Sequence, residues 1–184
     1  MSSRLVVVLG GTRSGKSRFG RDRAAALASD GGSVVYLGTV VAGGGDAELD
    51  ERVRRHRLDR PADWATVEVG RDLAGAIRSV EPGTTILLDG LTLWMSLVFG
   101  DDPSPIDDLL DGSFADALAA IAAHGGPVVV VSDEIGLGMV PLEPLSRAFR
   151  DLLGIAHQRL VAQSDEAWFM VAGRPLALQP YEDA

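Results

Sequence analysis

The chain has 184 residues, of which 46% are hydrophobic and 23% charged, a balance that excludes a disordered protein and suits a domain with a buried core. Its formal net charge of −9 is the opposite of what nucleic-acid phosphates attract, so we expect no nucleic-acid partner. The lack of cysteine excludes disulfides, thiol nucleophiles and cysteine-held zinc or iron–sulfur centres. No apolar run suits a signal peptide or a membrane span, so we expect a cytoplasmic protein.

Short runs of Val, Ile and Leu without polar alternation recur along the chain, as in strands that are buried on both faces of a parallel sheet. They cover residues 5–9, 34–37, 85–88, 128–131 and 167–171. Helical spacing of apolar residues follows at 73–80, 114–121 and 145–160. The alternation predicts one α/β domain over residues 1–184, with a mostly parallel sheet and helices on both faces. Residues 43–45 and 100–105 are expected loops, the first a candidate mobile lid.

The strongest motif follows the first predicted strand. Residues 10–17 read GGTRSGKS, which matches G-x-x-x-x-G-K-[ST], and a helical pattern follows it. Backbone N–H groups of such a loop converge on phosphate oxygens, and the helix N-terminus adds positive potential. Lys16 would bind the β- and γ-phosphates, and the Ser17 hydroxyl would ligate Mg²⁺. Lys16 is the only lysine among 17 basic residues, and it falls where a compact ammonium is needed.

Acidic residues end two of the predicted strands. Asp89 follows the run at 85–88, where a P-loop protein places its second acid near Mg²⁺; the alternative is that Asp89 only caps the next helix. Asp133 and Glu134 follow the run at 128–131, and Glu134 is a candidate to accept a proton from an attacking hydroxyl. A polar turn with no role in the chemistry is the alternative for this pair.

Of three histidines, only His56 has neighbours that indicate chemistry. Arg52, Arg55 and Arg57 surround it in a predicted helical segment. Nearby cations disfavour the imidazolium, so we expect His56 to be neutral and nucleophilic, with the arginines able to hold phosphate oxygens. A solvated basic helix with a structural histidine is the alternative.

The remaining histidines and two tryptophans have structural interpretations. His124 lies at a predicted helix end, where histidine is common. His157 is expected on a polar or partner-facing side of the long C-terminal helix. Trp64 and Trp94 are able to stack on a ligand, but burial is the expected explanation.

The combined motifs resemble one family, in order and over nearly the whole chain. They are GGTRSGKS at 10–17, YLGT at 36–39, DAEL at 46–49, R-V-x-x-H-R-x-x-R-P at 52–61, LLDGLTLW at 87–94, EIGLGMVP at 134–141 and VAGRPL at 171–176. This pattern resembles the bifunctional adenosylcobinamide kinase / adenosylcobinamide-phosphate guanylyltransferases of cobalamin biosynthesis. The resemblance implies a RecA-like P-loop fold assembled as a homotrimer.

The resemblance also implies two reactions on a corrinoid. The first phosphorylates a hydroxyl of adenosylcobinamide with ATP or GTP, and the second transfers GMP from GTP through a histidine, which matches His56, onto that phosphate. Lys16 and His56 are the implied catalytic residues, and Ser17 and Asp89 the implied Mg²⁺ ligands. The implied nucleotide-binding residues are Gly10, Gly11, Thr12, Arg13, Ser14, Gly15, Lys16, Ser17, Gly38, Thr39, Val40, Arg57, Leu58, Asp59, Arg60, Glu68 and Asp89.

Two positions depart from the family pattern in ways that bear on the site. Asp133 stands where asparagine is usual, which adds negative charge beside the nucleotide, and His157 stands near another usual asparagine. Two alternatives stay open beside the bifunctional enzyme: a P-loop kinase without guanylyl transfer, and a non-catalytic nucleotide-binding switch.

Overall fold

Seven strands form one sheet in a computed structural model that describes residues 4–28, 32–39, 61–100 and 106–180. The strands are β1 Leu5–Gly10, β2 Val34–Gly38, β3 Ala65–Glu68, β4 Thr85–Asp89, β5 Val128–Asp133, β6 Glu166–Val171 and β7 Arg174–Leu178. Their order is β3-β2-β4-β5-β1-β6-β7, and every neighbouring pair is parallel except β6 and β7. The five strands predicted from apolar runs are all present.

The two edge strands were not predicted. β3 has four residues, of which three are exposed, and β7 is exposed throughout and contains Pro175. Neither carries the continuous apolar run of a strand that is buried on both faces, because edge strands have one neighbour and little cover.

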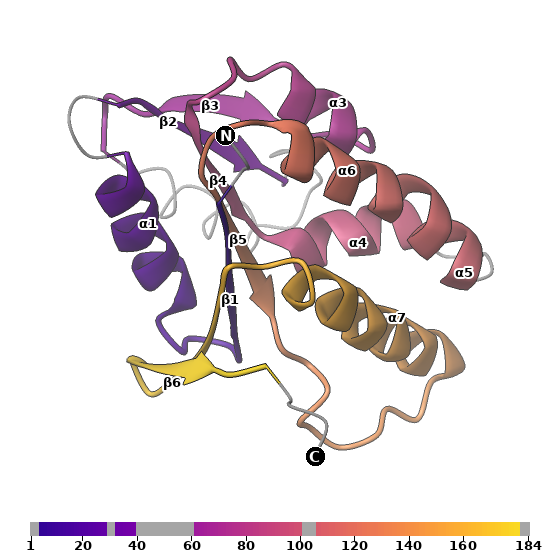
Figure 1. The fold of residues 1–184 in the computed structure, drawn as a ribbon. Coiled ribbons are helices and arrows are strands. Elements are labelled where there is room, and N and C mark those ends of the chain that lie inside the picture. The colour runs from indigo at the N-terminus through magenta and orange to yellow at the C-terminus, as the bar shows by residue number, and fades with distance from the viewer. Residues whose placement is uncertain (1–3, 29–31, 40–60, 101–105, 181–184) are drawn as a thin grey trace.

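Helices cover both faces of the sheet, as predicted (Figure 1). α1 (Lys16–Leu27) packs on one face, against β1, β4 and β5. On the other face lie α3 (Leu73–Arg78), α4 (Leu91–Phe99), α6 (Ala115–Ala123) and α7 (Pro144–Val161). A short helix, α5 (Ile106–Leu109), and a wide turn, η1 (Leu110–Phe114), lead into α6. Among the described ranges, no helix has the length and apolar character that a membrane crossing requires.

The core has two parts because alternate residues of each strand face opposite helical layers. Val6 and Val8 of β1 pack with the α1 side, whereas Val7 and Leu9 pack with the larger α3–α7 side. α1 lies very close to β5: a Cβ added at Gly20 would stand 2.5 Å from a methyl carbon of Val131. The sequence therefore needs glycine at this helix–sheet contact.

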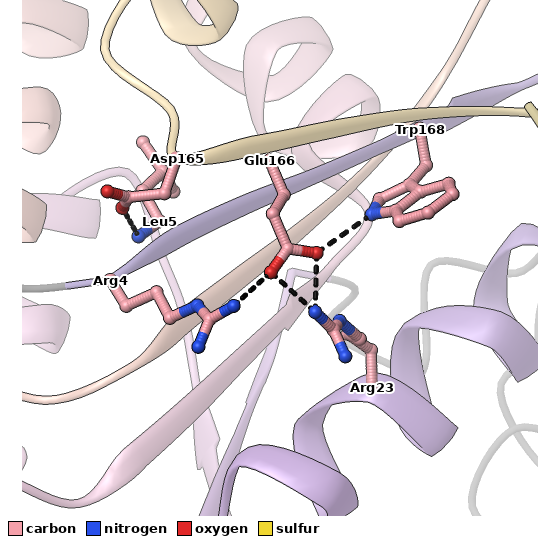
Figure 2. A network of polar contacts seen from close by, with 6 residues as sticks. All are labelled: Arg4, Leu5, Arg23, Asp165, Glu166 and Trp168. Carbon is pink, nitrogen blue, oxygen red and sulfur yellow. Dashed lines mark hydrogen bonds and ion pairs between the residues drawn. The ribbon is translucent and has the colours of Figure 1, made fainter. Parts of the chain in front are cut away.

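A polar network ties α1 to the sheet on this face. Figure 2 shows the Glu166 carboxylate of β6 accepting hydrogen bonds from the guanidinium groups of Arg4 and Arg23 and from the indole N–H of Trp168. These partners, Arg23 foremost, lower the pKa of Glu166 to about 2. Beside the network, Asp165 accepts the backbone N–H of Leu5 at 2.7 Å.

Candidate active site

The carboxyl ends of the parallel strands bring the candidate residues to one edge of the sheet. The register places Gly10 beside Asp133, and Gly38 between Glu68 and Asp89. In open α/β sheets, ligands bind outside the carboxyl ends of the strands. This edge is therefore the place at which to look for the site.

The loop that joins β1 to α1 has the backbone geometry of a phosphate-binding loop. Its turn needs left-handed conformations at Arg13 (φ 55°) and Gly15 (φ 95°), and the N–H of Ser14 closes it by donating to the carbonyl of Gly11 at 3.2 Å. The Ser14 Oγ is buried and has no hydrogen-bond partner among the described residues. A buried hydroxyl and the first turn of a helix thus both offer donors to an anion in this loop.

Lys16 is folded over the loop and is only 6% exposed. Its Nζ lies 2.5 Å from Oδ1 of Asp133 and donates to the carbonyl of Gly11 at 3.2 Å. The buried ammonium thus has a carboxylate as its counter-ion. A phosphate that enters the loop would take over this pairing.

Ser17 and Asp89 meet at the start of α1 and the end of β4. The Ser17 hydroxyl donates to Oδ1 of Asp89 at 3.2 Å. Oxygen donors of this kind fit Mg²⁺, which commonly takes one or two protein ligands and completes its shell with phosphate and water. In the described ranges, no group of three or more His, Cys, Asp or Glu side chains is placed to hold a metal ion.

The end of β2 completes this edge. Thr39 is buried, and its hydroxyl donates to the carbonyl of Gly90 at 3.0 Å, at the start of α4. Gly90 adopts φ 115°, and its N–H donates to the carbonyl of Val131 at 3.2 Å. Glu68 ends β3 beside Gly38. The structure thus brings Gly38, Thr39 and Glu68 to the same edge as the loop.

Several sequence-predicted residues lie outside the described residues. They are Val40, His56, Arg57, Leu58, Asp59 and Arg60, together with the proposed lid at 43–45 and most of the loop at 100–105. Their roles stay predictions from the sequence.

The prediction for His157 was wrong. The side chain is not on a polar side of α7: the residue is 5% exposed and faces the sheet. Its Nε2 lies 2.8 Å from Oγ of Ser132, and its Nδ1 lies 3.6 Å from Oε2 of Glu134. Burial lowers the pKa of His157, and the Glu134 and Asp133 carboxylates oppose this effect. The spacing to Leu153 and Leu160 on the buried stripe could have indicated this position.

Two structural expectations are confirmed. His124 follows α6, is buried, and has Nε2 2.7 Å from the carbonyl oxygen of Thr84. Trp94 is fully buried, and its indole N–H donates to the carbonyl of Arg71 at 3.1 Å. Neither side chain is therefore placed to bind a ligand.

Comparison with solved structures shows the fold class. The chain is similar to the flagellar accessory protein FlaH from Methanocaldococcus jannaschii, with a TM-score of 0.50, 11% identity, and coverage of 94% of this chain and 74% of that one. It is also similar to a second solved structure, an ATPase domain, with a TM-score of 0.53, 11% identity, and coverage of 90% and 68%. The fold is thus the RecA-like P-loop fold that was expected.

Comparison with known sequences shows the family. The bifunctional adenosylcobalamin biosynthesis protein CobP of Pseudomonas aeruginosa is 41% identical over 94% of this chain and 96% of its own length. The proteins named CobU from Salmonella typhimurium and Escherichia coli are 36% and 33% identical, each over 92% of this chain and 96% of their own length. The family model for cobinamide kinase / cobinamide phosphate guanyltransferase matches residues 6–178. The chain therefore belongs to the cobinamide kinase / cobinamide phosphate guanyltransferase family.

Proposed function

We propose that this protein phosphorylates adenosylcobinamide with ATP or GTP and then transfers GMP from GTP onto the new phosphate, giving adenosylcobinamide-GDP. The observation that supports this most strongly is the β1–α1 loop. In it, a buried Lys16 and a buried Ser14 hydroxyl, which has no hydrogen-bond partner in the described part of the chain, stand beside the Ser17–Asp89 pair. This arrangement suits a nucleoside triphosphate. Family membership supports the corrinoid as the acceptor.

In the kinase step, the acceptor hydroxyl attacks the γ-phosphorus, and the bond from that phosphorus to the β–γ bridging oxygen breaks. Lys16 and the loop N–H groups stabilise charge on the phosphate oxygens during the transfer. Ser17 and Asp89 would hold Mg²⁺, which when bound neutralises phosphate charge. Glu134, the residue after the Lys16 counter-ion Asp133, is our candidate for accepting the hydroxyl proton.

In the guanylyl step, we infer that His56 attacks the α-phosphorus of GTP and that pyrophosphate leaves. The phosphate of the phosphorylated corrinoid then attacks the same phosphorus, which releases His56. A covalent intermediate divides one difficult transfer into two easier ones. This assignment is supported by the sequence around His56, where three arginines favour a neutral imidazole.

Product analysis with adenosylcobinamide and α-labelled GTP tests both steps. We expect phosphorylated and then guanylylated corrinoid, and label on the protein that is acid-labile and base-stable, as a phosphoramidate is. His56→Ala should lose the protein-bound label and the GMP product but keep the kinase product, whereas Lys16→Arg should lose turnover and keep the fold. Phosphorylated corrinoid that never acquires GMP would indicate a kinase alone. Nucleotide binding without any corrinoid product would indicate a switch.

We further infer a homotrimer, as the family resemblance implies. Apolar side chains between β5 and α7 support an assembly that covers them, since Met139 is 95% and Leu142 94% exposed in the single chain. Light scattering on the purified protein tests this inference. A mass equal to one chain would contradict it.

A further inference from the structure

Three buried polar side chains form a chain of hydrogen bonds behind Glu134. The backbone N–H of Asp133 donates to the hydroxyl oxygen of Thr92 at 2.7 Å, and this oxygen lies 2.9 Å from Oγ of Ser132. Ser132 Oγ in turn lies 2.8 Å from Nε2 of His157. The other ring nitrogen of His157 has no hydrogen-bond partner among the described residues, yet it is fully buried and lies 3.6 Å from Oε2 of Glu134. The imidazole therefore connects the interior of the fold to a carboxylate of the site.

The direction of these hydrogen bonds follows from counting protons. Thr92 Oγ1 already accepts from a backbone N–H, and its own proton has one acceptor among the described residues, the Ser132 oxygen. Ser132 must then donate its proton to Nε2 of His157. An imidazole that accepts at Nε2 carries its proton on Nδ1, the nitrogen that faces Glu134.

The opposite direction has two costs. If Nε2 of His157 donated to Ser132, and Ser132 to Thr92, the buried Thr92 proton would have no acceptor in the described part of the chain. A neutral ring would also turn the bare lone pair of Nδ1 toward the Glu134 carboxylate. The first direction satisfies both hydroxyl protons, and the one proton that it leaves without a hydrogen bond among the described residues, on Nδ1 of His157, lies opposite the Glu134 carboxylate.

We propose that His157 is a positioning residue for the phosphoryl-transfer step: its Nδ1–H holds the Oε2 atom of Glu134 and so fixes the carboxylate that receives the substrate proton. Glu134 is already held on its other oxygen, since Oε1 accepts the N–H of Gly136. Its backbone N–H donates to the carbonyl of Gly10 at 3.0 Å, next to the phosphate-binding loop. A shift that brings Nδ1 to the ordinary N–H···O distance of about 2.9 Å would fix both carboxylate oxygens. This inference rests on the proposed role of Glu134.

His124 supplies an internal contrast. It is buried like His157, but its Nε2 lies 2.7 Å from a backbone carbonyl oxygen, which can only accept. His124 must therefore carry a proton on Nε2, whereas His157 in its neutral form carries it on Nδ1. The burial that lowers the pKa of His157 favours the neutral form at neutral pH.

Nitrogen-15 NMR of the three imidazole rings, assigned with His→Gln variants, tests the tautomer without any activity assay. At about pH 8 we expect a protonated Nδ1 and a bare Nε2 for His157, and a protonated Nε2 for His124. Ser132→Ala should weaken the preference at His157 and leave His124 unchanged. A His157 ring with its proton on Nε2 would overturn the proposal.

Two variants of His157 separate positioning from packing. Asparagine places an amide N–H where Nδ1 stands and so keeps the donor to Glu134. Glutamine places its amide near the Nε2 position, so it keeps the hydrogen bond with Ser132 but loses the donor to Glu134. For the kinase step, we expect His157→Gln to lower kcat at least about tenfold with nucleotide KM within about twofold, and His157→Asn to retain activity within about threefold of wild type. His124→Gln, which keeps the donor to Thr84, is the matched control and should behave as wild type.

Thermal unfolding of the same variants shows what packing alone contributes. Both His157 variants lose the buried ring and should lose similar stability, so equal losses of kcat in the two would assign His157 a structural role and overturn the proposal. A wild-type protein that makes no phosphorylated corrinoid would instead contradict the proposed function. In that case the NMR result still decides whether His157 directs a proton at Glu134.

Discussion

The contact between Lys16 and Asp133 bears directly on nucleotide affinity. The ammonium that would bind phosphate is buried and lies 2.5 Å from a carboxylate oxygen. A bound nucleotide must displace this carboxylate from Lys16 and then lie beside its negative charge. Asp133 therefore opposes phosphate binding twice, as a competitor for Lys16 and as a like charge.

Replacing Asp133 with asparagine should tighten nucleotide binding. The amide keeps the shape of the side chain but removes its charge, so we expect the Kd for GTP or ATP, measured by calorimetry, to fall by about tenfold. Raising the salt concentration should shrink the difference between variant and wild type, because salt screens the repulsion. Asp111→Asn is the control, since Asp111 pairs with Arg159 at the surface. Unchanged or weaker binding by Asp133→Asn would show that the pairing helps to preorganise Lys16 instead.

Glu166 makes the stability of the fold depend on acid. Its pKa is lowered to about 2 in the folded protein, below the ordinary value of 4.5, chiefly by the Arg23 hydrogen bond. A lowered pKa stabilises the fold above the unfolded value, and this stability is lost as pH falls through the window between 4.5 and about 2. We expect Glu166→Gln to cost about 2 kcal/mol in urea unfolding at neutral pH and much less near pH 2. An equal cost at both pH values would mean that packing, not charge, explains the loss.

At the scale of elements, the sequence predicted the strands that are buried and missed those at the edges. β1, β2, β4 and β5 carry apolar runs because both of their faces are covered. β6 also carries such a run, although only Ala167 and Met170 of it are buried. β3 and β7 form because a neighbouring strand offers hydrogen-bonding groups. For β3 this neighbour is β2, which is distant in sequence. Pairing of this kind leaves no periodic pattern in the strand itself.

The same distinction holds in the candidate site. The β1–α1 loop and the acids at the strand ends were predictable, because a local motif or a strand end marks each of them. The Thr92–Ser132–His157 chain was not, since it joins α4, β5 and α7 through side chains that have no shared sequence spacing. The Lys16–Asp133 contact likewise depends on the register of β1 and β5. Residues that are brought together only by strand register need the structure.

The contact between α1 and β5 gives a matched pair of glycine substitutions. Gly20 lies in α1 against Val131, whereas Gly154 lies in α7 with no atom within 4 Å of an added Cβ. Alanine favours both helices by about 0.5–1 kcal/mol relative to glycine. We expect Gly154→Ala to raise the free energy of unfolding by about this amount, and Gly20→Ala to lower it by about 1–3 kcal/mol because the helix must move off the sheet. Stabilisation by both changes in thermal unfolding would show that α1 packs less closely than described.

For the whole molecule, the site joins elements that are separate in sequence. The loop before α1, the end of β4 and the end of β5 contribute Lys16, Ser17, Asp89 and Asp133, and these residues already contact one another in pairs. A nucleotide that bridges them binds only the folded chain. Its binding energy must therefore appear as folding stability.

This linkage predicts a nucleotide-dependent melting temperature. At a free GTP concentration of about 100 Kd, with magnesium, we expect about 2.7 kcal/mol of added stability, which for a chain of this size raises Tm by about 5–10 °C. Lys16→Ala should abolish most of the increase, because the buried ammonium is the main cation of the loop. Asp133→Asn should show the same rise in Tm at a lower nucleotide concentration, because the variant has no carboxylate to compete for Lys16. A Tm that rises equally in wild type and Lys16→Ala, measured by differential scanning fluorimetry, would place the nucleotide elsewhere on the molecule.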